Sequence, residues 1–502
     1  DRIPSEFYKN APDIFYEGLL SLFNYIYEVG CTPGSFSKSI VFPMFNRGEI
    51  NDVSNYRGIS CIDTVAKLFT GLLLSRLECF VEENNLLSEF QAGFRRGFST
   101  LDNLFILTNI IKLRFLKRKQ KVYCFFVDFS AAFDRINRRA LILKLFNLGV
   151  SYKFLSVIKS LYQETFAAVR GREGISQFFH VNSGVRQGCL LSPLLFSLFL
   201  DDLPECLEGG VRVANKVFNV LMYADDIVLL GDNPIQLQRN INALYRYCDQ
   251  WGLSVNLNKS KIMVFRRGGR LSSKERWVYG EHAIEVVNKY RYLGVLLTPR
   301  LCFKNHIKER VVSAKVAVNS VWSGLISQNV VPSSKKFLLF NSVSRSIACY
   351  AAQIWGYQRY EVLEQLLRFF IKKLYSLPNI TPNYMLYVET GVDLLLLFTL
   401  RMHFNYCLKV LNLPQSRLPR ILALEVIKQN AYWFGSWIRL AEKYDCVFSP
   451  SINDWECWRD QLAALIVRIR TVHREEVIAS ARASFRFSHY GQLDLNEMLF
   501  SF

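Results

Sequence analysis

The chain has 502 residues, of which 50% are hydrophobic and 14% aromatic, so it can bury a large core and is long enough for two to four domains. Lys and Arg number 62 against 43 Asp and Glu, a formal net charge of +19. An excess of this size indicates a polyanionic partner, nucleic acid before a membrane surface, although a merely basic protein is the plainer alternative.

Neither a membrane span nor a cysteine framework is expected. The strongest apolar run, residues 189–200, is too short to cross a bilayer and predicts a core helix. The twelve cysteines form no C-x-x-C pair and only six histidines accompany them, so we interpret them as reduced core residues of an intracellular protein. The sequence starts at Asp1 without a signal peptide, and we expect it to be a region of a longer polypeptide.

Helix and strand signals are mixed up to about residue 300, and amphipathic helices follow. One helix opens with a capping box of Ser99 and Asp102, another has Ser192 as cap and Pro193 at its first position, and a third ends at Gly252. Strands are predicted at residues 121–129, 217–223, 227–230, 261–266 and 290–298. The fold class is therefore α+β, with a mostly helical remainder.

Two adjacent carboxylates, Asp225 and Asp226, separate two predicted strands in the stretch "VFNVLMYADDIVLLGD". A polar hairpin turn is the ordinary interpretation. A third carboxylate, Asp128, ends another apolar strand, and the three could meet at one point. Divalent metal would then relieve their repulsion, and two Mg²⁺ ions could support an in-line displacement at phosphorus. From the residues alone this is one possibility among several.

Seven blocks in order resemble the reverse transcriptases of non-LTR (LINE-type) retrotransposons. They begin with "NDVSNYRGISCIDTVAKLFTGLLLSRL" and "LSEFQAGFRRGFSTLDNLFIL", which are similar to finger blocks, and continue with "FFVDFSAAFDRINRRAL", "SGVRQGCLLSPLLFSLFLDDLP", "LMYADDIVLL", "WGLSVNLNKSKIMVF" and "YRYLGVLL", which are similar to palm motifs A to E. The resemblance implies a right-hand polymerase fold with fingers, a palm built on an antiparallel sheet, and a helical thumb. The implied divisions are an N-terminal extension with fingers (1–120), palm (121–300), thumb (301–400) and a helical C-terminal connector of unknown role (401–502).

The resemblance also assigns metal ligands. Asp128 and Asp225 would bind two Mg²⁺ ions, for which Mn²⁺ could substitute, and the backbone carbonyl of Phe129 would add a ligand. Asp226 would have a weaker or more distant metal role. Three further carboxylates are interpreted as structural or solvent-facing: Asp134, Asp201 and Asp202.

Substrate-binding residues follow from the same motifs. Phe133 would abut the sugar 2′ carbon and favour dNTPs over rNTPs, with a plain core aromatic as the alternative. Gln187 would line the nucleotide pocket, and Gly188 would let the backbone approach the substrate. Arg57 would pair with the triphosphate. Arg47 in "FNRGE" is a less secure second phosphate contact, because the family usually has a more basic sequence there.

Lys259 matches the motif D lysine, a general acid for the departing pyrophosphate, and Lys261 is the competing choice. Phe94, Arg95 and Arg96 in "GFRRGFS" would contact template phosphates with some stacking on bases. The RNA–DNA duplex would be recognised through its backbone and 2′-hydroxyls.

The resemblance implies an RNA-directed DNA polymerase that transfers nucleotides from dNTPs to a DNA primer 3′-hydroxyl on an RNA template, with priming at the target DNA. An endonuclease domain is expected in the missing part of the polypeptide. The protein would be made in the cytoplasm and act in the nucleus. Two alternatives stay open: an inactive or domesticated RNA-binding relic, and a group II intron-type maturase.

Overall fold

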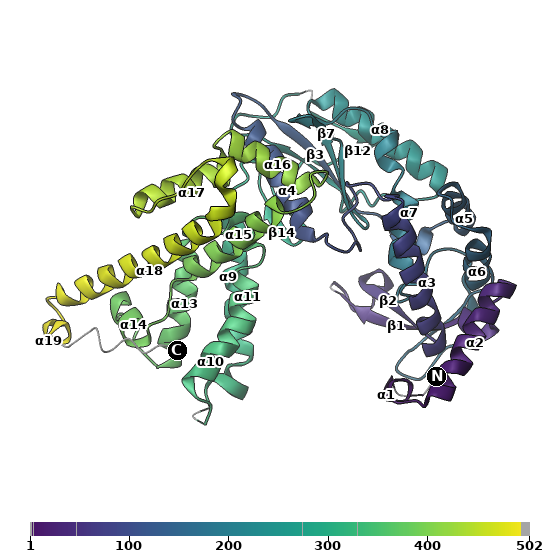
Figure 1. The fold of residues 1–502 in the computed structure, drawn as a ribbon, viewed down its shortest axis with the longest axis horizontal. Coiled ribbons are helices and arrows are strands. Elements are labelled where there is room, and N and C mark those ends of the chain that lie inside the picture. The colour runs from purple at the N-terminus through teal and green to yellow at the C-terminus, as the bar shows by residue number, and fades with distance from the viewer. Residues whose placement is uncertain (1–2, 4, 47, 274, 329, 493–502) are drawn as a thin grey trace.

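The computed structural model describes residues 3, 5–46, 48–273, 275–328 and 330–492, which form an arch (Figure 1). The helices of the first half are α1 Ser5–Lys9, α2 Asp13–Val29, α3 Thr64–Glu83, α4 Thr100–Arg114, α5 Arg138–Asn147, α6 Tyr152–Gln163, α7 Ser192–Leu200 and α8 Pro234–Trp251. The strands are β1 Lys38–Phe45, β2 Tyr56–Ile62, β3 Val122–Val127, β4 Phe166–Val169, β5 Phe179–His180, β6 Val211–Val213, β7 Lys216–Phe218, β8 Val220–Tyr223, β9 Asp226–Gly231, β10 Lys261–Phe265, β11 Val278–Tyr279, β12 His282–Ala283, β13 Tyr290–Tyr292 and β14 Val295–Leu297.

The later chain is helical, as expected. Its helices are α9 Lys304–Ser320, α10 Ser333–Phe340, α11 Ser346–Ala348, α12 Ala352–Trp355, α13 Glu361–Leu374, α14 Asn383–Thr390, α15 Leu395–Leu411, α16 Leu418–Lys428, α17 Tyr432–Lys443, α18 Trp458–Arg482 and α19 Ser488–Gly491. No single helix within the described residues has the length and apolar character of a membrane span, whereas α14 and α15, bent by 68°, meet those criteria only as a pair.

Two four-stranded sheets organise the first 300 residues. The central sheet, in the order β10-β3-β9-β8, is antiparallel throughout and lies at the crown of the arch (Figure 1). The side sheet, in the order β2-β1-β4-β5, lies in the limb that also holds α2 and α3. The α+β class predicted from the sequence is therefore confirmed.

Strand β3 is buried on both faces, and its alternate side chains enter two different cores. Val122, Cys124 and Phe126 join a core that includes α4 and extends through the C-terminal helices to Ala481. The other alternate set, with Phe125, joins a core formed with α3 and α5 to α8. A strand in this position holds whatever follows it rigidly in place, and the residue after β3 is Asp128.

Several local expectations need correction. Residues 290–298 are a hairpin of β13 and β14 instead of one strand, because Leu293 and Gly294 both have positive φ, 43° and 79°, which turns the chain back on itself. Helix α7 begins at Ser192, so Leu191 takes the cap position. The capping box of Ser99 and Asp102 on α4 is confirmed.

The expectation of core cysteines is only partly correct. All twelve thiols are free, but only five are buried and six are exposed. Cys61 shows the reason, since it lies on the face of β2 that alternates toward solvent.

Gly294→Ala tests the β13–β14 hairpin. A Cβ at this position would have φ +79° and would lie 2.8 Å from the Tyr350 ring, so we expect a loss of about 1–3 kcal/mol in the free energy of unfolding. The matched control, Gly268→Ala, introduces a Cβ with nothing within 4 Å and should leave stability unchanged. Denaturant unfolding measures both variants, and equal stabilities would contradict the hairpin geometry.

Candidate active site

The turn between β8 and β9, residues 223–226, carries the two adjacent carboxylates and is called here the Asp225 turn. Tyr223 pairs with Asp226 across the hairpin, so only Ala224 and Asp225 form the connection. Ala224 adopts φ +56°, a left-handed conformation that alanine rarely takes. On the neighbouring strand Val127 pairs with Ile227, which brings Asp128 level with Asp226. The three carboxylates predicted to meet are therefore together at one end of the central sheet.

A loop that precedes α4, residues 88–99, holds the Asp225 turn from the other side and is called here the bracing loop. The buried side chain of Gln91 accepts hydrogen bonds through Oε1 from the N–H groups of Gly93 (2.9 Å) and Ala224 (3.1 Å). Backbone bonds with Met222 extend the contact, so the loop pairs with β8 like a short additional strand. A Cβ on Gly93 would lie 2.3 Å from the Ala224 nitrogen, so only glycine fits there.

The peptide groups around Asp128 are held by the loop before β10. The Asp128 N–H donates to Ser260 Oγ (3.0 Å), and the Asp128 carbonyl accepts from the Asn256 N–H (2.8 Å). This loop also carries Lys259, whose Nζ lies 3.7 Å from Asp128 Oδ2 with the side chain largely exposed. Lys261 instead pairs with Glu285 at 2.8 Å, away from the carboxylates. Of the two lysines considered from the sequence, only Lys259 is at the site.

The opposite wall comes from β2 and the loop of residues 184–188. Arg57 on β2 lies close enough to Asp225 and Asp226 for its positive charge to lower the pKa of both and favour their ionised forms. The Ser60 N–H donates to the carbonyl of Gln187 at 2.7 Å, which joins the loop to the same strand. Gly188, at φ +124°, approaches the backbone of Ser60 so closely that a Cβ would lie 2.3 Å from the Ser60 carbonyl oxygen. The contact that requires glycine here is therefore with β2.

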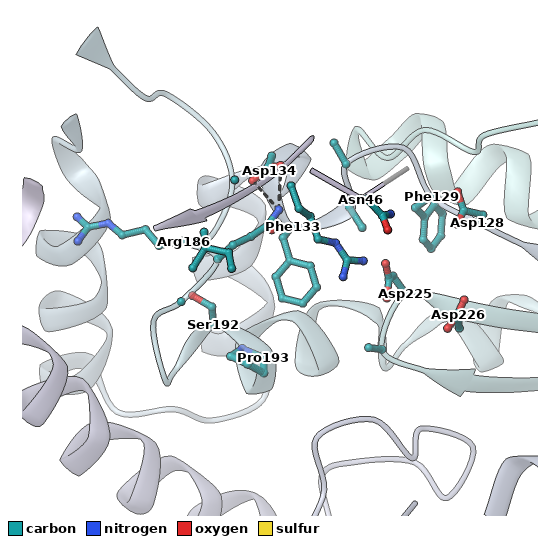
Figure 2. A pocket seen from close by; sticks show the side chains of 18 of the residues that line it. Asn46, Asp128, Phe129, Phe133, Asp134, Arg186, Ser192, Pro193, Asp225 and Asp226 are labelled. Carbon is teal, nitrogen blue, oxygen red and sulfur yellow. Dashed lines mark hydrogen bonds between the residues drawn. The ribbon is translucent and has the colours of Figure 1, made fainter. Parts of the chain in front are cut away.

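Phe133 forms the base of the space between these walls. Its ring stacks on Phe196 of α7 (centroids 4.5 Å apart, planes at 13°) and meets Phe94 edge-to-face at 6.4 Å. The neighbouring Asp134 accepts hydrogen bonds from Gln187 Nε2 at 3.2 and 3.1 Å (Figure 2). Asp134, interpreted from the sequence as structural or solvent-facing, thus fixes the amide of Gln187.

These elements enclose a cavity of about 690 Å³, a size typical of small-molecule sites (Figure 2). Figure 2 shows Asp225 and Asp226 grouped with Asp128 at one end and Phe133 with Asp134 toward the other. The sequence-predicted residues that line the cavity are Arg57, Phe94, Asp128, Phe129, Phe133, Gln187, Gly188, Asp225, Asp226 and Lys259. Arg47 lies outside the described residues.

The two arginines of the bracing loop do not line this cavity. Arg95 donates to the carbonyls of Ser88 (2.7 Å) and Gln91 (3.1 Å) and lies 4.0 Å from the Phe98 ring centroid. Burial lowers its pKa, and its hydrogen bonds are internal, so its contacts in the structure differ from the open phosphate contact expected from the sequence. Arg96 is exposed and forms an ion pair with Glu78 at 3.2 Å.

Electrostatics at the carboxylates favour a bound cation. Exclusion of water by the surrounding protein, with the charges of Asp225 and Asp128, raises the pKa of Asp226 to about 6, although its side chain keeps an exposed edge. Burial, together with Asp128, also raises the pKa of Asp225, while Arg57 and Lys259 act in the opposite direction. A divalent cation would supply the missing positive charge.

The donor set fits Mg²⁺ better than a softer metal. Within the described residues, no three Asp, Glu, His or Cys side chains form a ready-made metal cage. Mg²⁺ needs only one or two carboxylates and completes its octahedron with water and phosphate oxygens. The oxygen ligands of Asp128 and Asp225 meet this requirement.

Gln91 is a site residue that the sequence did not reveal. Its side chain is fully buried, and its partner Ala224 is 133 residues away in the chain. Periodicity and local motifs carry no information on such a contact. The only available signal was a glutamine two residues before a glycine in "QAGF".

Comparison with protein families and with curated proteins points to one family. The reverse transcriptase (RNA-dependent DNA polymerase) family model matches residues 47–297. Similar curated proteins include the RNA-directed DNA polymerase from mobile element jockey of Drosophila funebris (26% identical over 358 residues, 69% of this chain and 38% of the relative) and the probable RNA-directed DNA polymerase from transposon BS of Drosophila melanogaster (29% over 362 residues, 69% and 39%). The chain spans about two fifths of these relatives. Among solved structures, apo telomerase from Candida tropicalis is similar at 13% identity and a TM-score of 0.40, over 82% of this chain and 74% of that one.

Metal binding should be visible as a pH-dependent gain in stability. Because the folded pKa of Asp226 (about 6) exceeds its unfolded value, the metal-free fold is stabilised by protonation at low pH and loses that contribution as pH rises through about 6. Mg²⁺ or Mn²⁺ should therefore raise the thermal midpoint at pH 7.5 much more than at pH 5. Differential scanning fluorimetry at constant ionic strength tests this. An equal midpoint rise in Asp225→Asn would contradict binding at this site.

Proposed function

The chain belongs to the reverse transcriptase (RNA-dependent DNA polymerase) family, and we propose that it is the polymerase region of a non-LTR mobile element. Its reaction is the transfer of nucleotides from dNTPs to a DNA primer 3′-hydroxyl on an RNA template. The observation that carries the proposal is the convergence of Asp128 and Asp225 with Arg57 and Gln187 on one cavity, from four different elements.

The carboxylates would hold the metal. Asp128 and Asp225, with the carbonyl of Phe129, would bind two Mg²⁺ ions, and Asp226 would contribute mainly charge. When bound, these ions activate the attacking hydroxyl and stabilise the leaving pyrophosphate. The protein contributes rigid placement, because Asp128 follows a strand buried on both faces and Asp225 sits in a turn fixed by Gln91.

The opposite wall would bind the nucleotide. The exposed guanidinium of Arg57 lines the cavity near the carboxylates, where it would bind oxygens of the triphosphate. Gln187, oriented by Asp134, would contact the sugar or base. Phe133 is held by its stack on Phe196, and a rigid ring at this position would exclude a 2′-hydroxyl.

Lys259 would protonate the departing pyrophosphate. Its ammonium group is at the metal-binding end of the cavity, and the exposed side chain is free to follow a leaving group. General acids placed in this way act by donating a proton as negative charge develops.

The wider partners belong to the same proposal. A formal charge of +19 suits an RNA template with a DNA primer or target, and salt should weaken such binding steeply. We infer target-primed synthesis in the nucleus, with an endonuclease domain elsewhere in the full polypeptide.

Primer extension on an RNA template, with a DNA primer, dNTPs and Mg²⁺, tests the reaction. We expect extension by the parent chain and none by Asp225→Asn, because the amide keeps the shape of the side chain but cannot supply the ligand charge. Asp249→Asn, an exposed carboxylate outside the cavity, is the matched control and should extend normally. A folded parent that binds the duplex without extending it would instead support an RNA-binding relic.

The two motif D lysines provide a matched pair for the general acid. Lys259→Met should reduce the extension rate by about 10²-fold or more, since positioned proton donors contribute typically 10²–10⁴-fold. Lys261→Met removes the pair with Glu285 and a 3.4 Å hydrogen bond to the Leu257 carbonyl, both outside the cavity, and should retain the parent rate. Single-nucleotide incorporation measured by rapid quench distinguishes the two, and equal rates would exclude Lys259 from this role.

A further inference from the structure

We propose that Arg417 is a positioning residue of the active site, through which the C-terminal helices hold the bracing loop and thereby orient the Asp225 turn. The proposal rests on the polymerase function proposed above. Among the described residues, none after Lys259 lines the cavity, so the region after residue 400 would contribute to catalysis without lining the cavity.

Arg417 precedes α16 and is buried with 7% of its surface exposed. Its guanidinium forms ion pairs with Glu89 (3.2 Å) and with Asp102 (3.3 Å). It also lies 3.5 Å from the ring centroid of Phe98. All three partners belong to the bracing loop or to the first turn of α4, so one side chain from the C-terminal region binds both ends of the loop.

Inside the loop the contact continues without a gap to the Asp225 turn. Arg95 stacks on the same Phe98 ring and donates to the carbonyls of Ser88 and Gln91. Gln91 in turn accepts from the Ala224 N–H. With Gly93 packed against that nitrogen, a shift of the loop has to move the turn.

Helix α4 provides a parallel connection. Tyr406 of α15 donates to Asp102 Oδ1 (2.7 Å), and Trp433 of α17 donates to Asn109 Oδ1 (3.1 Å). From another face of the helix, Asn103 donates to the carbonyl of Met222 (3.0 Å), directly before the turn. The helix therefore lies between C-terminal contacts and β8.

Charge explains why the loop depends on Arg417. Glu89 and Asp102 are two partly or fully buried carboxylates, and Asp102 is also bonded to the Ser99 N–H in the capping box. If the guanidinium is removed, both carboxylates lose their ion pair with it, and Arg95 remains as a cation near Glu89. Glu89 would then gain solvation by moving toward solvent. That movement would pull the loop away from β8.

Arg417→Met and Arg417→Lys test the inference in the full chain, with Arg470→Met as matched control. Arg470 forms a two-bond ion pair with Asp393 in the same C-terminal region but makes no contact with the bracing loop. Below the unfolding midpoint of every variant, we expect Arg417→Met to lower kcat by about 10²-fold, the typical cost of a 1 Å misplacement, with an unchanged KM for dNTP. Arg417→Lys keeps the positive charge but loses the planar guanidinium, so its kcat should lie between those of the parent and Arg417→Met.

Hydrogen exchange provides a readout independent of activity. The amide hydrogens of Gly93 and Ala224, both bonded to Gln91, should exchange faster in Arg417→Met than in the parent chain. Their exchange rates in Arg470→Met should equal those of the parent. If Arg417→Met does not fold, Phe98→Leu removes the stacking platform and keeps the ion pairs. Parent-like kcat and exchange in a folded variant would overturn the proposal. If the parent chain does not extend primers, the proposed function fails, and the exchange result alone then decides whether Arg417 holds the turn.

Discussion

The mutual repulsion of Asp128, Asp225 and Asp226 is the constraint on which the rest of the structure depends. Three carboxylates at neighbouring strand ends raise each other's free energy, and burial increases the cost, as the raised pKa values of Asp225 and Asp226 indicate. A flexible frame would relieve this repulsion by letting the strands move apart. The frame here prevents that, because β3 and β9 are packed on both faces and the turn is bonded to Gln91.

Holding the carboxylates together has consequences on both sides of the cavity. Positive charge is supplied by Arg57 from one wall and by Lys259 from another, but neither forms a close ion pair with Asp225 or Asp226 within the described residues. The site is thus left short of positive charge, and metal with a triphosphate can complete it. Because these charged groups are already ordered in the folded protein, the reaction step needs no further free energy to orient them.

Local sequence patterns allowed three carboxylates to meet, and the resemblance to non-LTR reverse transcriptases supplied other cavity residues such as Arg57, Gln187 and Lys259. Asp128 follows an apolar strand, Asp225 interrupts a hairpin, and Ser99 and Asp102 cap a helix, so each pattern fixes its residue within a few positions. What could not be predicted depends on partners distant in the chain. The role of Gln91 depends on its hydrogen bond with Ala224, and that of Asp134 on its hydrogen bond with Gln187. The orientation of Arg95 depends on a loop whose sequence has no periodic pattern. The β13–β14 hairpin was missed because Leu293 gave no turn signal before Gly294.

The core also connects the C-terminal region to a cavity that none of the described C-terminal residues lines. One face of β3 packs on nearby sequence, whereas the other contributes to a core that runs without interruption from α4 through α15 and α16 to α18. No break in that core coincides with residue 300 or 400. Helix α4 lies against the central sheet and the C-terminal helices pack on α4, and Arg417 adds a charged contact where these helices meet the bracing loop. A rigid sheet edge carrying three carboxylates requires support on both faces, and on the second face α4 provides it with the C-terminal helices packed behind it.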